Sequence, residues 1–140
     1  MGSRSEGRAA ALQVLYSLDT RAAFEEVEGE LKQAREGLLA DLPAEVYDFA
    51  AEICQGVVEH REAIDEAIEA ASERWRLRRM SRVDRNILRV ATFELLLCPE
   101  VPTKVAINEA IELAKGYGAT ESRQFVNGIL DRVQRVKQDA

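Results

Sequence analysis

The sequence predicts an all-α fold, and three observations lead to that prediction. Apolar residues recur every three to four positions through almost the whole chain, which is the repeat of an amphipathic helix. No stretch shows the alternating pattern rich in Val, Ile and Thr that is typical of a strand. Short connections separate about seven helical segments, as in a compact helical bundle.

The N-terminal half contains four of these segments. The first is expected over residues 5–18 and the second over residues 22–39. The third follows Pro43, because proline is tolerated in the first turn of a helix. The fourth is expected over residues 62–73. The side chains expected to face inward are Ala11, Leu12 and Leu15, then Phe24, Val27, Leu31, Ala34 and Leu38, then Val46, Phe49, Ala50, Ile53, Val57 and Val58, and finally Ile64, Ala67, Ile68 and Ala71.

The C-terminal half contains three more segments. A cap at Ser81 begins a helix that runs to Cys98 and is apolar on nearly every side, which is typical of a central core helix. Its polar stripe consists of Arg82, Arg85, Asn86 and Arg89. The next helix is expected over residues 103–115, with Gly116 as its left-handed terminator. The last is expected over residues 120–136.

Length and composition predict a single domain over residues 1–140. A chain of 140 residues buries roughly 68–70% of its unfolded surface, which suffices for a core without disulfide or metal support. No apolar run approaches the roughly 20 residues that span a bilayer, and the N-terminus lacks the apolar region of a signal peptide. One histidine and two cysteines exclude a disulfide framework and zinc sites of the usual Cys/His spacing. We therefore expect a soluble cytoplasmic protein with no cofactor, no metal and no membrane attachment.

Charge is distributed unevenly along the chain. The net charge is −6, but residues 1–70 carry 6 basic and 16 acidic side chains, whereas residues 71–140 carry 13 and 9. Seven arginines lie between Arg74 and Arg89. They are either a solvated helix end that pairs with the acidic half, or a site for a partner with carboxylates or phosphates, which guanidinium groups bind at two points. Trp75, within this cluster, is either an interface anchor or a cover for the end of the bundle.

The sequence lacks the motifs of common enzymes. It has no Gly-rich phosphate loop, no G-x-S-x-G and no H-E-x-x-H. Acidic pairs such as Glu109 and Glu112 are typical of exposed helix faces, and His60 is typical of a helix-capping or surface residue. Cys54 and Cys98 are interpreted as small buried apolar residues. We therefore expect a protein without catalytic activity.

Two groups of residues have the chemistry of a nucleic-acid site. Arg4 and Arg8 flank the start of the first helix and Tyr16 follows two turns later, so that arginines for phosphates accompany a ring that can stack on a base. The alternative is a Tyr16 ring packed in the core with its hydroxyl in water. The second group lies in the first turns of the last helix, where free N–H groups and polar side chains form an anion site. It consists of Ser122, Arg123, Gln124 and Asn127.

The stretch K-V-A-I-N-E-A-I-E-L-A-K at residues 104–115 is the most specific motif in the chain. It is followed by Gly116-Tyr117-Gly118 and by F-V-N-G-I-L-D at residues 125–131. Residues 8–16 and V-D-R-N-I-L-R at residues 83–89 belong to the same pattern. With these motifs, essentially the whole chain resembles the NusB family of transcription antitermination factors.

The resemblance to NusB implies an all-α fold of two small packed bundles without catalysis. It implies binding of the boxA element in nascent ribosomal RNA together with a ribosomal protein, called NusE in this role, in a complex that helps RNA polymerase ignore terminators. Carried over by position, the RNA-binding residues are Arg4, Arg8, Tyr16, Glu121, Gln124, Phe125 and Asn127. The NusE-binding residues are Arg82, Val83, Asp84 and Arg85, with Asp84 at the centre.

One departure from the family pattern concerns RNA affinity. Glu6 lies between Arg4 and Arg8, where family members often have a denser basic cluster. We therefore expect modest affinity for RNA alone and a larger contribution from NusE. Two other functions stay open. One is a self-associating NusB-like module. The other is the RNA-binding domain of a ribosomal RNA methyltransferase, since some of those enzymes begin with a NusB-like domain.

Overall fold

The computed structural model describes the backbone of residues 2–139 and the side chains of residues 2–137. Within that range lie seven α-helices and two short 3-10 turns, and no strand, so the all-α prediction is confirmed. None of these helices is long and apolar enough to cross a membrane. The helices are α1 (Ser3–Thr20), α2 (Val27–Glu36), α3 (Ala44–Glu59), α4 (Arg61–Ala71), α5 (Arg82–Leu97), α6 (Thr103–Tyr117) and α7 (Ser122–Asp139), with η1 (Phe24–Glu26) and η2 (Leu77–Arg79) between them.

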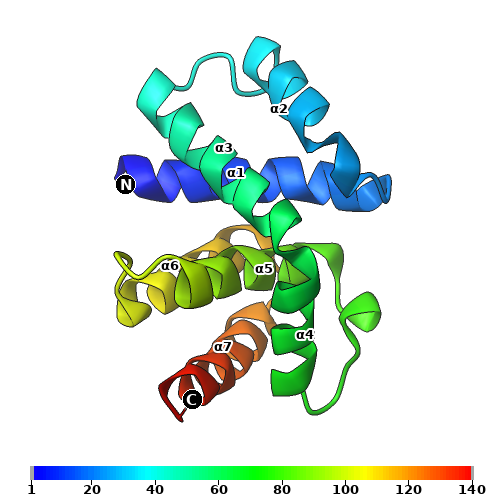
Figure 1. Cartoon of the computed structure of the whole chain (residues 1–140), viewed down its shortest axis with the longest axis vertical. Helices are drawn as coiled ribbons and strands as arrows, with labels where there is room; N and C mark the ends of the chain where they lie inside the picture. The colour runs from blue at the N-terminus through cyan, green and yellow to red at the C-terminus, as the bar shows by residue number, and fades with distance from the viewer. Residues whose placement is uncertain (1, 140) are drawn as a thin grey trace. The chain divides into compact units, whose positions relative to one another are not determined.

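The chain divides after Glu59 into two compact units. In the first unit α3 crosses α1, and α2 packs against both helices (Figure 1). The crossing depends on Gly7, because a Cβ at this position would lie 2.5 Å from Cδ2 of Phe49. The fully buried side chains of the crossing are Ala11, Leu15 and Leu18 on α1 and Ala50, Cys54 and Val57 on α3.

The second helix is shorter than predicted. Residues 24–26 form the turn η1, and α2 ends at Glu36. Leu38, which was expected to face inward, is 75% exposed, whereas Leu39 is 5% exposed. The helical repeat stops at Gly37, so the chain beyond it reaches the core with the next leucine instead.

The second unit surrounds α5, which contacts α4, α6 and α7 (Figure 1). Every residue of α5 from Asn86 to Leu95 is buried, which confirms the prediction of a central helix. The predicted cap is also present, because the Asp84 backbone N–H donates to Ser81 Oγ over 3.0 Å. The capping hydroxyl satisfies one of the first N–H groups, which otherwise lack partners within the helix.

The polar stripe of α5 is partly inside the protein. The buried Arg89 donates from Nε to Oδ1 of Asp65 over 2.8 Å and from Nη2 to Oδ2 over 3.2 Å. Its Nη1 donates to Oδ1 of Asn86 over 3.0 Å, and Asn86 Nδ2 donates to the Arg82 carbonyl over 2.8 Å. This network joins α4 to α5, so the stripe has a structural role that its helical spacing does not reveal.

The prediction that Gly116 ends α6 in a left-handed conformation is wrong. No described glycine has a positive φ, and α6 continues through Gly116 to Tyr117. Gly118 follows the helix with φ −92°, which any residue adopts. A glycine is needed there for space instead, because a Cβ would lie 2.6 Å from Ser122 Oγ and 2.8 Å from the Ala114 carbonyl oxygen.

Candidate nucleic-acid interface

Helix α1 carries three of the predicted RNA-binding residues. The Arg4 side chain is exposed and Tyr16 is 41% exposed, so the Tyr16 ring is not enclosed in the core. Arg8 is different, because only 4% of it is exposed. In this structure Arg4 and Tyr16 are available to a ligand, whereas the Arg8 side chain is covered by protein.

The ring of Phe49 on α3 lies beside both arginines of α1. The guanidinium carbon of Arg4 is 4.2 Å from the ring centroid and that of Arg8 is 5.4 Å from it, which are cation–π distances. Stacking uses the face of a guanidinium group and leaves the N–H donors at its edge available. Arg4 and Phe49 line a hollow of about 380 Å³ together with the acidic residues Glu45, Asp48 and Glu52. These three carboxylates oppose a phosphate at Arg4, which agrees with the modest affinity expected from Glu6.

The start of α7 carries the second predicted group. Ser122 is 2% exposed, and its Oγ accepts a hydrogen bond from the Ala119 N–H over 2.9 Å. Ser122 therefore supports the connection into α7 rather than facing a ligand. Around it, Glu121, Arg123, Gln124 and Asn127 are exposed and Phe125 is half-buried.

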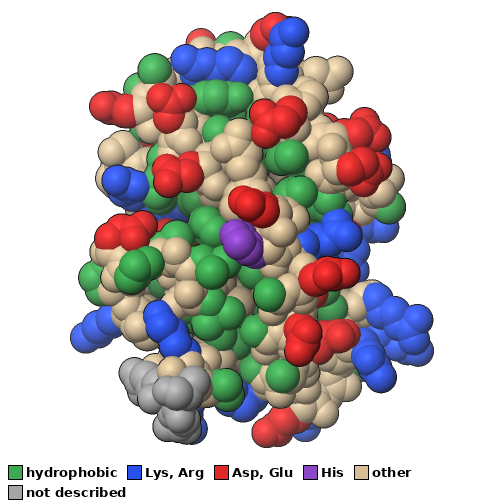
Figure 2. All heavy atoms as spheres, in the orientation of Figure 1, with side chains coloured by type: hydrophobic (Ala, Val, Ile, Leu, Met, Phe, Trp, Pro, Cys, Tyr) green, Lys and Arg blue, Asp and Glu red, His purple; other side chains and the backbone are tan. Residues whose placement is uncertain are grey.

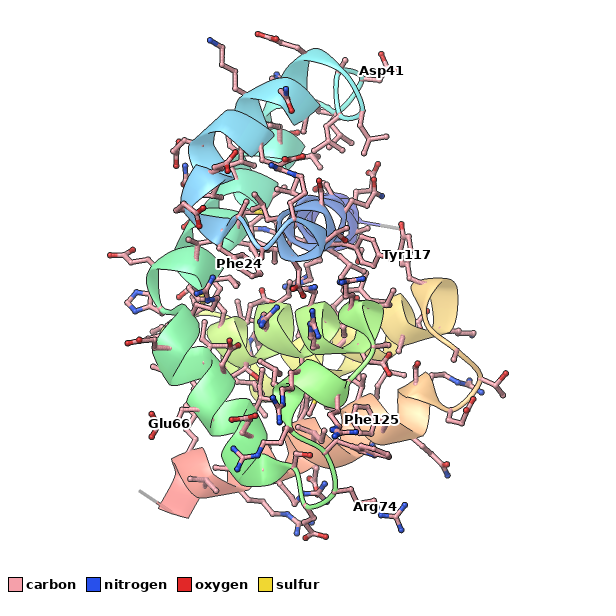
Figure 3. All side chains as sticks on the ribbon, turned by 90° about the vertical axis from the view of Figure 1, so that its right-hand side faces the viewer. Phe24, Asp41, Glu66, Arg74, Tyr117 and Phe125 are labelled. Carbon is pink, nitrogen blue, oxygen red and sulfur yellow. The ribbon has the colours of Figure 1, made fainter. Side chains whose placement is uncertain are left out.

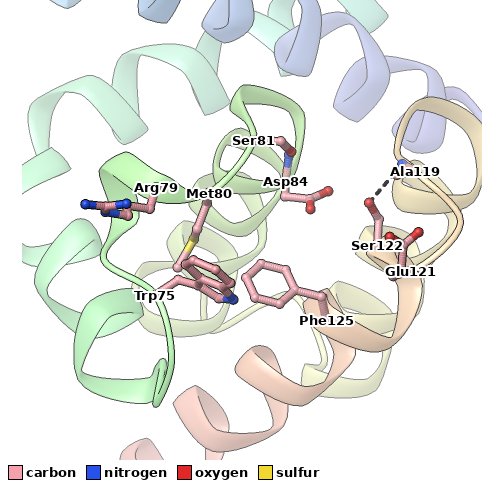
Figure 4. Close-up of a pocket in the computed structure, with 9 residues that line it drawn as sticks. All are labelled: Trp75, Arg79, Met80, Ser81, Asp84, Ala119, Glu121, Ser122 and Phe125. Carbon is pink, nitrogen blue, oxygen red and sulfur yellow. Dashed lines mark hydrogen bonds between the residues drawn. The ribbon is translucent and has the colours of Figure 1, made fainter.

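A pocket of about 220 Å³ in the second unit brings together residues predicted for two different partners (Figure 4). Asp84, predicted to bind NusE, lines it together with Glu121 and Phe125, predicted to bind RNA. The rings of Trp75 and Phe125 lie close to each other, next to the Met80 side chain (Figure 4). The remaining lining residues are Arg79, Ser81, Ala119 and Ser122.

Asp84, which lines this pocket, has one carboxylate oxygen without a hydrogen-bond partner in the described part of the chain. Its Oδ1 is buried and has no hydrogen-bond partner among the residues that the structure describes. A buried carboxylate oxygen without a donor is unfavourable, and nearly all buried polar atoms in proteins are paired. With the carboxylates of Asp84 and Glu121 and two aromatic rings in its lining, the pocket is suited to a planar group that carries N–H donors.

The four residues predicted to bind NusE occupy the first turn of α5. Arg82 is exposed, while Val83, Asp84 and Arg85 are half-buried. Arg85 Nη1 donates to the Arg78 carbonyl over 3.4 Å. Successive helix residues point about 100° apart, so these four do not form one face. Arg82 and Arg85 lie one turn apart on one side, whereas Asp84 is at the pocket.

Residues outside the predicted set also contribute to these sites. Trp75, Arg79 and Met80 line the pocket, and Phe49 contacts the arginines of α1. Trp75 is 48% exposed, so it is neither a buried cover for the bundle nor a fully solvated side chain. A tryptophan among arginines is a signal in the sequence, but nothing in the sequence distinguishes Phe49 from a core residue.

The described residues contain no group of three His, Cys, Asp or Glu side chains that could hold a metal ion. Cys54 is fully buried, and its Sγ donates to the Ala11 carbonyl over 3.6 Å. Burial raises the pKa of the Cys54 thiol far above its ordinary value, because the thiolate is poorly solvated there. Cys54 therefore stays a thiol in the folded protein at neutral pH.

The profile of the NusB family matches residues 5–135 of the chain. The chain belongs to the NusB family. Transcription antitermination protein NusB of Trichlorobacter lovleyi is 49% identical over 139 residues, which covers 99% of this chain and 95% of that relative. The resemblance predicted from the motifs is thus confirmed, and it places the chain among proteins named for transcription antitermination rather than for a catalysed reaction.

Solved NusB structures have the same fold. T. maritima NusB is 38% identical with a TM-score of 0.81, covering 94% of this chain and 90% of that chain. A chain in the crystal structure of antitermination factors NusB and NusE in complex with dsRNA is 26% identical with a TM-score of 0.86, covering 97% of this chain and 98% of that chain. The predicted NusB-like helical fold is therefore confirmed.

Proposed function

We propose that this NusB-family protein is a non-catalytic, cytoplasmic antitermination factor that binds boxA RNA together with NusE in the antitermination complex of RNA polymerase. The observation that carries the proposal is its similarity to an antitermination protein over nearly the full length of both chains. The structural likeness to a chain from a complex of NusB, NusE and dsRNA supports it further.

Under the proposal, residues of each of the two units supply distinct interactions with single-stranded RNA. Arg4 donates to a phosphate, and Tyr16 and Phe125 offer rings on which bases stack. The amides of Gln124 and Asn127 carry both donors and acceptors, so they can pair with base edges. Glu121 accepts hydrogen bonds from the amino groups of bases.

The buried Arg8 side chain can contact a phosphate only if RNA binding exposes it. The sequence assigns it to a phosphate, but its side chain is covered in this structure. Under the proposal RNA binding uncovers Arg8, so Arg8→Gln lowers both the affinity and its dependence on salt. Unchanged salt dependence would remove Arg8 from the phosphate contacts.

NusE binding is proposed at the first turn of α5, around Asp84 with Arg82, Val83 and Arg85. Arg82 is the exposed charge of this group. We expect Arg82→Glu to weaken NusE binding while boxA binding in the absence of NusE stays the same.

The proposal is tested by fluorescence anisotropy of labelled boxA RNA, with and without NusE, at two salt concentrations. A scrambled RNA of the same composition serves as the control for sequence selectivity. Selective binding that tightens when NusE is added supports the proposal. Equal binding of both RNAs, or none with NusE present, would overturn it.

Self-association and a methyltransferase origin make different predictions. A homodimer predicts a molecular mass that rises with concentration in light scattering, with or without RNA. The similarity that carries the proposal is to a transcription antitermination protein, of which this chain covers 95%.

A further inference from the structure

The connection between α4 and α5 carries a dense group of positive charge. Residues 74–79, which we name the arginine segment, contain Arg74, Arg76, Arg78 and Arg79, and all four side chains are exposed. Lys and Arg side chains gather over this connection in Figure 2, and Figure 3 shows Arg74 pointing away from the ribbon. Within the described part of the chain, no carboxylate forms an ion pair with any of the four.

The backbone of the arginine segment is held in place. Ser72 Oγ donates to the Trp75 carbonyl over 2.8 Å and accepts from the Trp75 N–H over 3.2 Å. Glu69 Oε2 accepts from the Leu77 N–H over 2.9 Å, and the side chains of Leu77 and Met80 are buried. The arginines therefore project from a fixed turn, which reduces the conformational entropy that a ligand must remove on binding.

The lack of internal ion pairs points to an external polyanion. Four like charges within six residues repel one another, although the chain carries 25 acidic residues that could have compensated them. Of the seven arginines between Arg74 and Arg89, Arg89 pairs with Asp65 of the acidic half, whereas the four arginines of the arginine segment have no such pair within the described residues. Guanidinium groups bind phosphates and carboxylates alike, so the neighbouring residues must distinguish the two.

The neighbours of the arginine segment favour RNA over an acidic peptide. Trp75 and Arg79 line the same pocket as Glu121 and Phe125, two residues of the proposed RNA site. Trp75 is half exposed, as a ring that stacks on a base must be. The carboxylates of Asp84 and Glu121 repel phosphates from the pocket itself, so the backbone of a bound strand is directed toward the arginines.

We infer that the arginine segment is a second RNA-contact element, in which arginines bind phosphates flanking boxA and Trp75 stacks on a flanking base. This inference rests on the proposed function. It assigns Arg74, Trp75, Arg76, Arg78 and Arg79 to a surface that does not depend on the sequence of the RNA, since every nucleotide has a phosphate and a π-face.

The test compares labelled boxA RNA with boxA RNA extended by a uridine tract on the 5′ side, on the 3′ side, or on both. Binding is measured across a salt series for wild type, Arg76→Gln/Arg78→Gln, and Lys104→Gln/Lys115→Gln. The last variant removes the same charge from exposed positions of α6. A further variant, Trp75→Leu, removes the ring but no charge.

We expect wild type to bind at least one extended RNA more tightly than boxA alone. In Arg76→Gln/Arg78→Gln that gain disappears, and the negative slope of log affinity against log salt becomes shallower by about 1.4, as two lost single-strand phosphate contacts require. Trp75→Leu loses part of the gain with an unchanged slope, and the lysine variant behaves as wild type. Circular dichroism and the charge-preserving Arg76→Lys/Arg78→Lys variant, which should keep the slope, separate unfolding from loss of contacts.

Two outcomes would overturn the inference while leaving the proposed function intact. One is selective boxA binding by wild type with no gain from any extension, or with the same gain in the arginine variant. The other is unchanged RNA binding with weakened NusE binding, which would make the segment a protein contact. Loss of selective boxA binding by wild type would instead overturn the proposed function.

Discussion

The guanidinium group of Arg4 stacks on the ring of Phe49, with 4.2 Å between its central carbon and the ring centroid. The two residues belong to different helices, α1 and α3, and meet because Gly7 lets these helices approach closely. The stack restricts a long side chain that would otherwise have to be ordered by RNA. Phe49 thus acts as a positioning residue for a proposed phosphate contact.

Removal of this ring should weaken RNA binding without removing a charge. An exposed cation–π contact contributes about 0.5–1 kcal/mol, so Phe49→Leu is expected to lower boxA affinity about two- to fivefold by anisotropy. The control is Tyr47→Leu, which removes a similar stack on Arg35 at 4.6 Å. Equal losses of affinity in both variants would indicate general destabilisation of α3 instead of positioning.

The pair formed by Asp65 and Arg89 should be important for stability. Asp65→Ala leaves the buried Arg89 guanidinium without its two-point partner, and breaking such a pair costs roughly 3–5 kcal/mol. The side chain of Asp65 is 23% exposed, so we expect a loss near the lower end of that range. Urea unfolding measures it, and a loss as small as that of the exposed pair variant Asp131→Ala would contradict this expectation.

Stability should fall as pH rises above 9. Burial raises the pKa of the Cys54 thiol above its ordinary value of 9.0, so the unfolded chain releases this proton first and is favoured at high pH. This group alone should remove about 1.4 kcal/mol of unfolding free energy by pH 10. The dependence should be smaller in Cys54→Ala and unchanged in Cys98→Ser, as measured by urea unfolding at pH 8, 9 and 10. Identical pH dependence in all three proteins would show that Cys54 is not its source.

The connection between α6 and α7 should tolerate no side chain at Gly118. Gly118→Ala places a Cβ against Ser122 Oγ and the Ala114 carbonyl, and overpacking of this kind costs roughly 1–3 kcal/mol. Gly116 is the control, because nothing lies within 4 Å of a Cβ there. Gly116→Ala in a helix should instead stabilise by up to about 1 kcal/mol. The stability of the two variants is compared by thermal unfolding. Equal melting temperatures would refute the steric explanation.

Most of the fold was predictable because helical periodicity is a local property. The central helix, its serine cap and the approximate bounds of the helices other than α2 follow from apolar spacing and capping residues. The errors occur where the burial of a side chain depends on the path of the chain beyond the end of a helix. Leu38 fits the helical repeat but lies beyond Gly37, where the helix has already ended.

The candidate site was less predictable, because it depends on which helices meet. Helical spacing groups Asn86 and Arg89 with exposed arginines, and only the position of Asp65 on α4 explains their burial. Phe49 has the pattern of a core residue, and only the approach of α1 gives it another role. The pairing of Trp75 with Phe125 joins residues 50 positions apart through a pocket that no local pattern indicates.

Under the proposed function, the two carboxylates that line the Trp75 and Phe125 pocket have a consequence for the choice among RNA targets. Arginines alone attract every transcript with similar strength, so a purely basic surface would be occupied mostly by irrelevant strands. Under the proposed function, Asp84 and Glu121 would penalise a strand that brings its backbone into the hollow, and would spare one that presents a base with amino groups. The negative charge of the chain, unfavourable for nucleic-acid binding in general, would in this way reject competitors and leave the surface vacant for its own target.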